Sequence, residues 1–188
     1  MIETPFKPIQ IFNTVIEDND KAIEDYHEIV KAWKENGLIT EQTNESNEMW
    51  TDYHAPRDTH EYRLETWAHL CIDYFEDAMT EFHETCHTGD LKYDEIWTQI
   101  TKGFGTHHPH NHGQYGYSFV WYIDVDPEVH KPTCYFNPNH PFEFWQPEMK
   151  KGQLLIWPRW LLHYQPPSNS DVDRYIISGN IGEIGAEE

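Results

Sequence analysis

Residues 151–163 read Lys-Gly-Gln-Leu-Leu-Ile-Trp-Pro-Arg-Trp-Leu-Leu-His, a turn followed by an apolar strand that leads to a histidine. Comparable short extended runs, separated by Pro, Gly and Asn, fill the chain after Gly89. They span residues 95–101, 117–125, 133–136, 142–145, 153–157 and 174–181. Their length and spacing predict antiparallel sheets packed as a double-sheet roll.

The first half of the chain has a helical pattern instead. One helix is predicted to begin at the N-cap candidates of residues 18–20 and to stop at Gly37. A second is predicted to run from a capping box at residues 58–61 to a stop at Gly89. Apolar side chains recur at three- and four-residue spacing in both: Ala22, Ile23, Tyr26, Ile29, Val30, Trp33; Leu64, Trp67, Cys71, Tyr74, Phe75, Ala78, Phe82. Helices followed by strands indicate the α+β class.

Two further segments lie beside the first helix. Residues 5–16 mix β-branched and aromatic side chains, which predicts an edge strand. Residues 38–56 are mostly polar and have no period, which predicts a loop over the mouth of a site, with Trp50 as its only large anchor.

Length and charge limit the class of protein. The 188 residues fit one domain, so we expect a single domain over 1–188, with a helical flank at about 17–90 and a jelly-roll core at about 91–182. The formal net charge is -20, from 33 acidic and 13 basic residues. Such a chain repels phosphate backbones, so direct nucleic-acid binding is not expected.

Localisation follows from two absences in the sequence. No leader pattern and no stretch long enough to span a bilayer are present, so we expect no membrane contact and a cytoplasmic protein. The three cysteines lack metal-type spacing and are expected to be reduced thiols: Cys71, Cys86 and Cys134. Oligomeric state is left open.

Histidines gather in the run Thr-His-His-Pro-His-Asn-His-Gly of residues 106–113. Alternation along an extended chain would put His108, His110 and His112 on one side, and neighbouring imidazoles at i and i+2 can reach one metal ion. A solvated, His-rich loop is the plain alternative for an isolated His-x-His pair. His163 comes 51 residues after His112, behind the strand quoted above, and makes a facial set of three ligands plausible.

An arginine follows the third histidine by eleven residues, at Arg174. Alternation along the last strand puts Arg174, Ile176, Ser178 and Asn180 on one face. An inward-facing guanidinium inside a roll needs an anion to offset its desolvation, and a bound carboxylate would supply it. An ion pair with one of the chain's own acids is the commoner explanation for a single arginine.

With these residues in view, the chain from about 95 to 182 resembles the 2-oxoglutarate and Fe(II)-dependent oxygenases, most closely the small ones encoded by phages and marine bacteria. That family has a His-x-His pair before Ser-x-x-x-Tyr, then Gly-x-Leu-x-x-x-Pro, a His, and a last strand containing Arg and Asn. The matching segments here are 110–112, 118–122, 152–158, 163 and 174–180. Ser46-Asn47 and Trp50-Thr51 also resemble that family's Ser-Asn-x-x-x-Trp segment.

The resemblance implies a double-stranded β-helix, a cupin-like jelly roll with flanking N-terminal helices. It implies an Fe(II) ion held by His110, His112 and His163. The cosubstrate 2-oxoglutarate would bind to Arg174, Tyr122, Ser178 and Asn180. With O2, an unidentified substrate would be oxidised, by default hydroxylated, and succinate and CO2 released. A phage-encoded protein would act in the host cytoplasm.

The sequence departs from the broad superfamily at the second ligand, where His112 replaces the usual Asp or Glu. Three neutral imidazoles leave an Fe(II) site more positive than two imidazoles and a carboxylate. Zinc competes for such a site, because three His and a water are also a common zinc ligand set. His108 is the alternative partner of His110 if the register differs.

Two other functions stay open. Gly152, Pro158 and His163 also resemble the second motif of cupins, some of which are three-His dioxygenases that do not use 2-oxoglutarate. That reading lacks the Glu expected after His-x-His and has no need of Arg174. A non-catalytic jelly roll that binds a partner through exposed aromatics is the third possibility: Trp145, Trp157 and Trp160.

Overall fold

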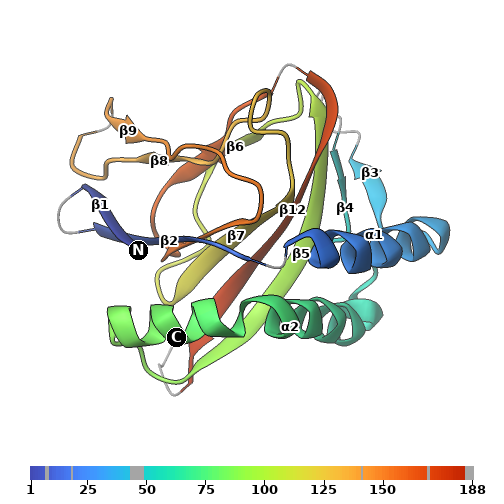
Figure 1. The fold of residues 1–188 in the computed structure, drawn as a ribbon, viewed down its shortest axis with the longest axis horizontal. Helices are drawn as coiled ribbons and strands as arrows, with labels where there is room; N and C mark the ends of the chain where they lie inside the picture. The colour runs from blue at the N-terminus through green and yellow to red at the C-terminus, as the bar shows by residue number, and fades with distance from the viewer. Residues whose placement is uncertain (7–8, 18, 43–48, 141, 169, 185–188) are drawn as a thin grey trace.

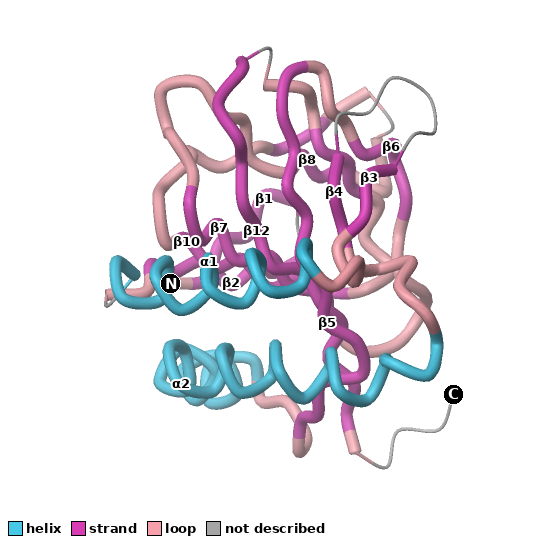
Figure 2. The backbone as a smooth tube through the Cα atoms, turned by 90° about the vertical axis from the view of Figure 1, so that its right-hand side faces the viewer, coloured by secondary structure: helices cyan, strands magenta, loops and turns pink. Residues whose placement is uncertain are grey.

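The computed structural model describes residues 1–6, 9–17, 19–42, 49–140, 142–168 and 170–184. Within these ranges the strands form two antiparallel sheets, one of eight strands and one of four. The helical elements in the same ranges are α1 (Asn19–Glu35), the 3-10 turn η1 (Arg57–Thr59) and α2 (His60–Cys86). Figures 1 and 2 show α1 and α2 along one side of the larger sheet.

The larger sheet combines strands from both ends of the chain. In spatial order its strands are β1 (Ile2–Phe6), β2 (Ile9–Val15), β10 (Gln153–Pro158), β7 (Tyr117–Asp124), β12 (Ser170–Glu183), β5 (Leu91–Gly103), β4 (Met49–Thr51) and β3 (Thr40–Gln42). The smaller sheet contains β6 (His107–His110), β11 (His163–Gln165), β8 (Cys134–Phe136) and β9 (Phe144–Trp145). The expected mainly antiparallel β architecture with two helices is confirmed.

Alternation along the strands of the larger sheet supplies two cores. On β10, Leu154 and Ile156 pack with the helices, whereas Leu155 and Trp157 pack in the second cluster, which includes Tyr135 of the smaller sheet. Both faces of β10 are therefore buried, which explains why its sequence reads as a continuous apolar run. Burying one such side chain contributes about 1.5–3 kcal/mol, so the two clusters hold the layers together.

Each helix buries one stripe against the sheet, as its apolar spacing predicts. On α1 the stripe includes Tyr26 and Trp33, and on α2 it includes Trp67 and Phe82. The end of α1 near Gly37, whose φ is +71°, agrees with the predicted left-handed stop. By contrast, α2 ends at Cys86 with a left-handed residue at position 87 instead of Gly89.

The start of α2 also differs from the prediction. The helix begins after η1 with Thr59 as its N-cap, and no side-chain hydrogen bond caps it, so the expected capping box is wrong. The predicted N-cap candidate Asp18 and the family-like pair Ser46-Asn47 lie outside the described residues.

The N-terminal segments contribute more strand than expected. Of the predicted range 5–16, residues 5–6 belong to β1 and residues 9–15 form β2, which lies inside the sheet because it pairs with β10 as well as β1. The described part of 38–56, predicted as loop, includes β3 and β4, and β4 pairs with β5 at Trp50↔Ile100. These strands are three residues long, too short to display an alternating pattern.

The turn before β10 is the one the sequence predicted. Gly152 has a φ of +75°, a conformation that favours glycine, and its amide donates to the carbonyl of Tyr122 at 2.8 Å. The turn therefore fixes β10 beside β7. Among the described residues, no helix is long and apolar enough to cross a membrane.

Candidate metal centre

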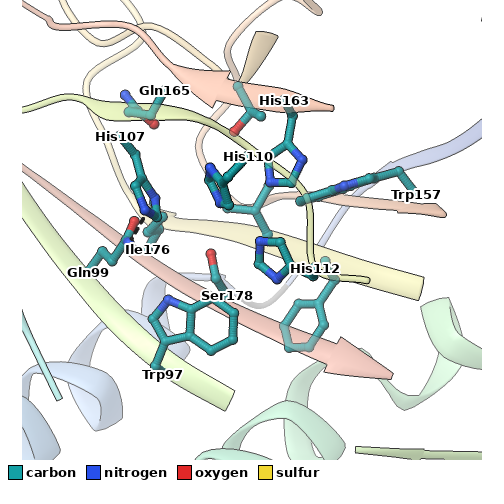
Figure 3. A pocket seen from close by; sticks show the side chains of 13 residues that line it. Trp97, Gln99, His107, His110, His112, Trp157, His163, Gln165, Ile176 and Ser178 are labelled. Atoms are coloured by element: carbon teal, nitrogen blue, oxygen red, sulfur yellow. Dashed lines mark hydrogen bonds between the residues drawn. The ribbon is translucent and has the colours of Figure 1, made fainter. Parts of the chain in front are cut away.

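Three histidines meet where the smaller sheet faces the larger one (Figure 3). His110 ends β6 and pairs directly with His163 of β11. His112 follows in the next loop, where its amide donates to the carbonyl of Arg159 at 3.0 Å. One nitrogen from each of the three imidazoles lies within 4.8 Å of the other two. Strand pairing thus brings together the three residues that the sequence proposed as ligands.

A register shift in β6 changes which other histidine faces the site. His163 pairs with His110 and Gln165 pairs with His107, so a step of two residues along β11 corresponds to a step of three along β6. This irregularity interrupts strict alternation. The expectation that His108 shares a side with His110 and His112 is therefore wrong: His108 is exposed and His107 lines the cavity instead.

Hydrogen bonds orient each imidazole of the triad. His110 Nδ1 lies 2.7 Å from the carbonyl oxygen of His108, and His163 Nδ1 lies 2.8 Å from that of Leu161. A carbonyl oxygen only accepts, so each Nδ1 must carry the proton and each Nε2 keeps its lone pair. His112 Nδ1 donates in the same way to Asn180 Oδ1 at 2.8 Å. All three rings therefore offer Nε2, the arrangement seen around metal ions in proteins.

Burial keeps these rings neutral. It lowers the pKa of His163 well below its ordinary value, and it lowers the pKa of His112 to about 4, with His110 adding to the effect. Burial also lowers the pKa of His110. The neutral imidazole is the form that binds a metal ion.

One buried nitrogen of the triad lacks a partner in the described structure, as a nitrogen that binds a metal ion would. His112 Nε2 is inaccessible to solvent and has no hydrogen-bond partner among the described residues. A buried nitrogen without a partner costs free energy, and a metal ion would satisfy it. The group within reach of one ion consists of imidazoles alone, a donor set that suits divalent iron or zinc.

Asn180 supports His112, although the sequence assigned it to the cosubstrate. Its Oδ1 accepts hydrogen bonds from His112 and, at 2.9 Å, from Ser118. Its Nδ2 lies 3.4 Å from the carboxylate of Glu95. Asn180 is therefore in contact with a proposed ligand and is oriented by two other side chains. The hydrogen bond between Asn180 and His112 joins residues that are far apart in the sequence, so residue spacing could not predict it.

We predict that Asn180→Ala lowers metal affinity about 10- to 100-fold, because His112 loses the acceptor that sets its tautomer and ring orientation. Asn180→Asp keeps an acceptor for His112 but replaces the Nδ2 donor with an oxygen beside the Glu95 carboxylate, so we expect it to recover only part of the lost affinity. Competition with a chelator of known affinity measures both variants. Equal losses in the two variants would mean that the hydrogen bond to His112 is not the cause.

Arg174 lies fully buried on β12, and no carboxylate of the described residues forms an ion pair with it. Its exposed fraction is 0%, and none of its three guanidinium nitrogens has a hydrogen-bond partner among the described residues. The guanidinium carbon lies 5.1 Å from the centroid of the Tyr122 ring. Burial lowers the pKa of Arg174 to about 10, so the group is still a cation at neutral pH. An unpaired buried cation is costly, which points to an anionic ligand.

Tyr122 forms the surface beneath this arginine. Its hydroxyl donates to Thr133 Oγ1 at 2.9 Å and accepts from the Thr133 amide at 2.8 Å. The hydroxyl is thus already bonded to Thr133, and the Arg174 guanidinium lies over the Tyr122 ring in a cation–π contact. Thr133 in turn lines the inner cavity beside the histidines, together with Ser178.

Two cavities lie beside the triad and share part of their lining. The inner one is narrow, about 30 Å³, and the outer one has about 350 Å³. Five lining residues are common to the two cavities: Trp97, Gln99, His107, His110 and His112. Of these, Trp97, Gln99 and His107 were not predicted as site residues, and only His107 had a signal in the sequence, its place next to the predicted His-x-His pair. Gln99 Nε2 and His107 Nδ1 are 3.3 Å apart on the shared wall (Figure 3).

Comparison with known proteins gives fold-level matches. No family model and no curated protein matches the chain. Among solved structures, HygX from Streptomyces hygroscopicus with nickel and 2-oxoglutarate bound shares 11% identity, at a TM-score of 0.64, over 95% of this chain and 85% of that one. The non-heme alpha ketoglutarate dependent epimerase SnoN from nogalamycin biosynthesis shares 9%, at 0.66, over 92% and 76%.

A viral structure has the same fold. The viral collagen prolyl hydroxylase vCPH from Paramecium Bursaria Chlorella virus-1, solved as a 2OG complex, shares 18% identity, at a TM-score of 0.55, over 92% of this chain and 97% of that one. At these identities the likeness concerns the fold. The chain therefore shares the fold of these solved enzymes.

Proposed function

We propose that residues 1–188 form a single-domain, Fe(II)- and 2-oxoglutarate-dependent oxygenase of the double-stranded β-helix type, and that it hydroxylates its substrate. The observation that carries this proposal is Arg174, a fully buried guanidinium without a partner among the described residues. It lies on the same face of β12 as Ile176 and Ser178, which line the cavity beside the histidines. A dicarboxylic acid that reaches from Arg174 to a metal ion on the three histidines would be held at its two ends.

The chain's residues would divide the work as follows. His110, His112 and His163 would hold Fe(II) through Nε2. Arg174 would bind the distal carboxylate of 2-oxoglutarate, with Ser178 as a hydrogen-bond donor and Tyr122 as the surface under the guanidinium. When bound, iron and 2-oxoglutarate together supply the activation of O2, with release of succinate and CO2.

Asn180 would act as a positioning residue, not as a cosubstrate ligand, because its amide is bonded to His112, Ser118 and Glu95. The inner cavity is narrow, so the side chains that line it would have to move apart when 2-oxoglutarate binds. A buried, water-poor cavity would then strengthen the contact between Arg174 and the carboxylate.

The alternatives account for fewer observations. A three-His dioxygenase that does not use 2-oxoglutarate, or a zinc site, would explain the triad but leave Arg174 as an unpaired buried charge. A purely binding jelly roll would explain neither feature. Iron and the dicarboxylic acid together account for both.

Anaerobic titration tests the proposal. Fe(II) is added to the metal-free protein, followed by 2-oxoglutarate, and we expect the weak visible charge-transfer absorption of an iron-bound 2-oxo acid. Succinate replaces 2-oxoglutarate in the control, because it has both carboxylates but no keto group. Absence of the band, together with absence of 2-oxoglutarate binding by calorimetry, would reject the oxygenase assignment.

A further inference from the structure

The outer cavity contains one carboxylate among otherwise uncharged or aromatic walls. Its lining residues include Glu95 and no Lys, Arg or second acid among those described. The cavity holds about 350 Å³, and His110 and His112 also line it. A molecule placed there would lie against the proposed metal centre, and among the side chains that the structure describes it would meet one acidic group, that of Glu95.

Glu95 has unused hydrogen-bonding capacity. In the described part of the chain, its carboxylate has one hydrogen-bond donor, Asn180 Nδ2 at 3.4 Å from Oε2, and no lysine or arginine forms an ion pair with it. A carboxylate accepts about four hydrogen bonds. A half-buried carboxylate with so few partners is best matched by a cationic donor.

Aromatic rings adjoin this carboxylate. The rings of Tyr53 and Trp97 meet edge to face at 5.2 Å, and Trp97 stacks on His112 at 5.6 Å. His54 lies against Tyr53 at 5.1 Å. Aromatic faces attract organic cations, and Trp is the best of them. Carboxylate and rings therefore favour the same kind of ligand.

The wall that carries Tyr53 and His54 is held rigidly. The neighbouring Asp52 is fully buried, and its carboxylate accepts from Trp67 Nε1 at 2.9 Å, from the Thr98 amide at 2.8 Å and from Arg63 at 3.3 Å. These bonds tie β4 to β5 and α2. The rings thus face the cavity from a fixed segment, which lowers the entropic cost of binding.

A short chain of contacts connects Glu95 with the metal centre. Asn180 reaches Glu95 with its Nδ2 and His112 with its Oδ1. Glu95 therefore lies one amide away from a proposed ligand, within the length of a small molecule. A cation bound at Glu95 would leave the rest of its carbon skeleton beside the histidines.

We propose that the outer cavity is the substrate site, and that it selects a molecule with a primary ammonium or guanidinium group, which Glu95 binds. This inference rests on the proposed oxygenase function and adds a substrate class to it. The formal net charge of -20 favours the approach of such a cation through its long-range field. The cation can come from a free amino acid or amine, or from a basic side chain of a peptide.

Matched pairs of probes test the selectivity. The full chain is loaded with Ni(II) and 2-oxoglutarate, so that no turnover occurs, and titrated by calorimetry with two pairs whose neutral member has no amine: N-acetyl-L-arginine amide against N-acetyl-L-citrulline amide, and n-pentylamine against n-pentanol. We expect at least one cationic member to bind about 10- to 100-fold more tightly than its neutral counterpart. Free L-arginine, added as a third arm, binds more weakly than N-acetyl-L-arginine amide if the substrate is a peptide side chain, and more tightly if it is a free amino acid.

Variants assign the effect to one residue. Glu95→Gln should abolish the preference and leave the affinity of the neutral probes unchanged, whereas Glu84→Gln, an exposed residue of α2, should have no effect. If Glu95→Gln does not fold by circular dichroism, Glu95→Asp is used, and a reduced preference is expected. No preference above threefold in either pair, or a preference that survives Glu95→Gln, overturns the inference. Binding of 2-oxoglutarate is measured first, so that failure of the oxygenase function itself is seen separately.

Discussion

Arg174→Met is expected to weaken 2-oxoglutarate binding by roughly thirty- to a thousand-fold, with little change in Fe(II) affinity. Methionine keeps most of the packing of the arginine stem and removes the charge. A charge-assisted, bidentate contact in a desolvated site is worth about 2–4 kcal/mol, part of which is the cost of leaving the carboxylate unpaired. Anaerobic titration with each ligand measures both affinities.

A matched control distinguishes the loss of a positive charge anywhere on the protein from the loss of the charge at Arg174. Arg57 is exposed on η1, so Arg57→Met removes one positive charge without touching the cavity, and 2-oxoglutarate should bind it as it binds the wild type. A folded Arg174→Met variant that binds 2-oxoglutarate as tightly as the wild type would exclude Arg174 as the anchor.

The same variant makes a further prediction about stability. An arginine paired with an internal acid would be costly to lose, but Arg174 has no acid beside it in the described structure. We therefore expect the ligand-free Arg174→Met variant to be at least as stable as the wild type. A saturating concentration of 2-oxoglutarate, about a hundred times Kd, should stabilise the wild type by about 2.7 kcal/mol and the variant hardly at all. Thermal unfolding with and without the ligand measures this; a large destabilisation without ligand would mean that Arg174 has a structural partner.

Residue patterns within short segments predicted those features of the fold that depend on neighbouring residues: a strand face, a turn and two helices. Alternation along 174–180 correctly placed Ile176 and Ser178 on the cavity face of β12, because that strand pairs with β5 in regular register from Arg174 to Asn180. The turn at Gly152 was predictable because a positive φ strongly favours glycine. The spacing of apolar residues predicted both helices, because a helix that packs on a sheet buries a stripe of side chains that repeats with the helical period.

Features that depend on pairing between distant segments were missed. The register shift that turns His107 inward and His108 outward arises where β6 meets β11, so nothing in residues 106–113 reveals it. Asn180 contacts His112 across 68 residues of sequence, and Glu95 reaches the same amide from β5. The strands β3 and β4 are stabilised by pairing at the sheet edge and carry no alternating signature.

His163→Ala is expected to lower Fe(II) affinity more than a hundred-fold and to remove 2-oxoglutarate-dependent succinate formation. The substitution deletes one of three ligand nitrogens, and two imidazoles cannot hold the ion facially. The fold should survive, because His163 pairs with β6 and β8 through its backbone, which alanine retains. His110→Ala and His112→Ala should behave similarly. Metal content after dialysis and succinate formation measure the effect, with circular dichroism to exclude unfolding.

His108→Ala is the matched control, and its expected result follows from the geometry. The His108 side chain is exposed, and its contribution to the site is a backbone carbonyl that accepts a hydrogen bond from His110 at 2.7 Å. Alanine retains that carbonyl, so Fe(II) affinity and succinate formation should stay within about threefold of the wild type, the size of an ordinary surface effect below 1 kcal/mol. A severe loss in His108→Ala together with a mild one in His112→Ala would instead make His108 and His110 the ligand pair, and would require a different register of β6 from the one that places His107 against the cavity.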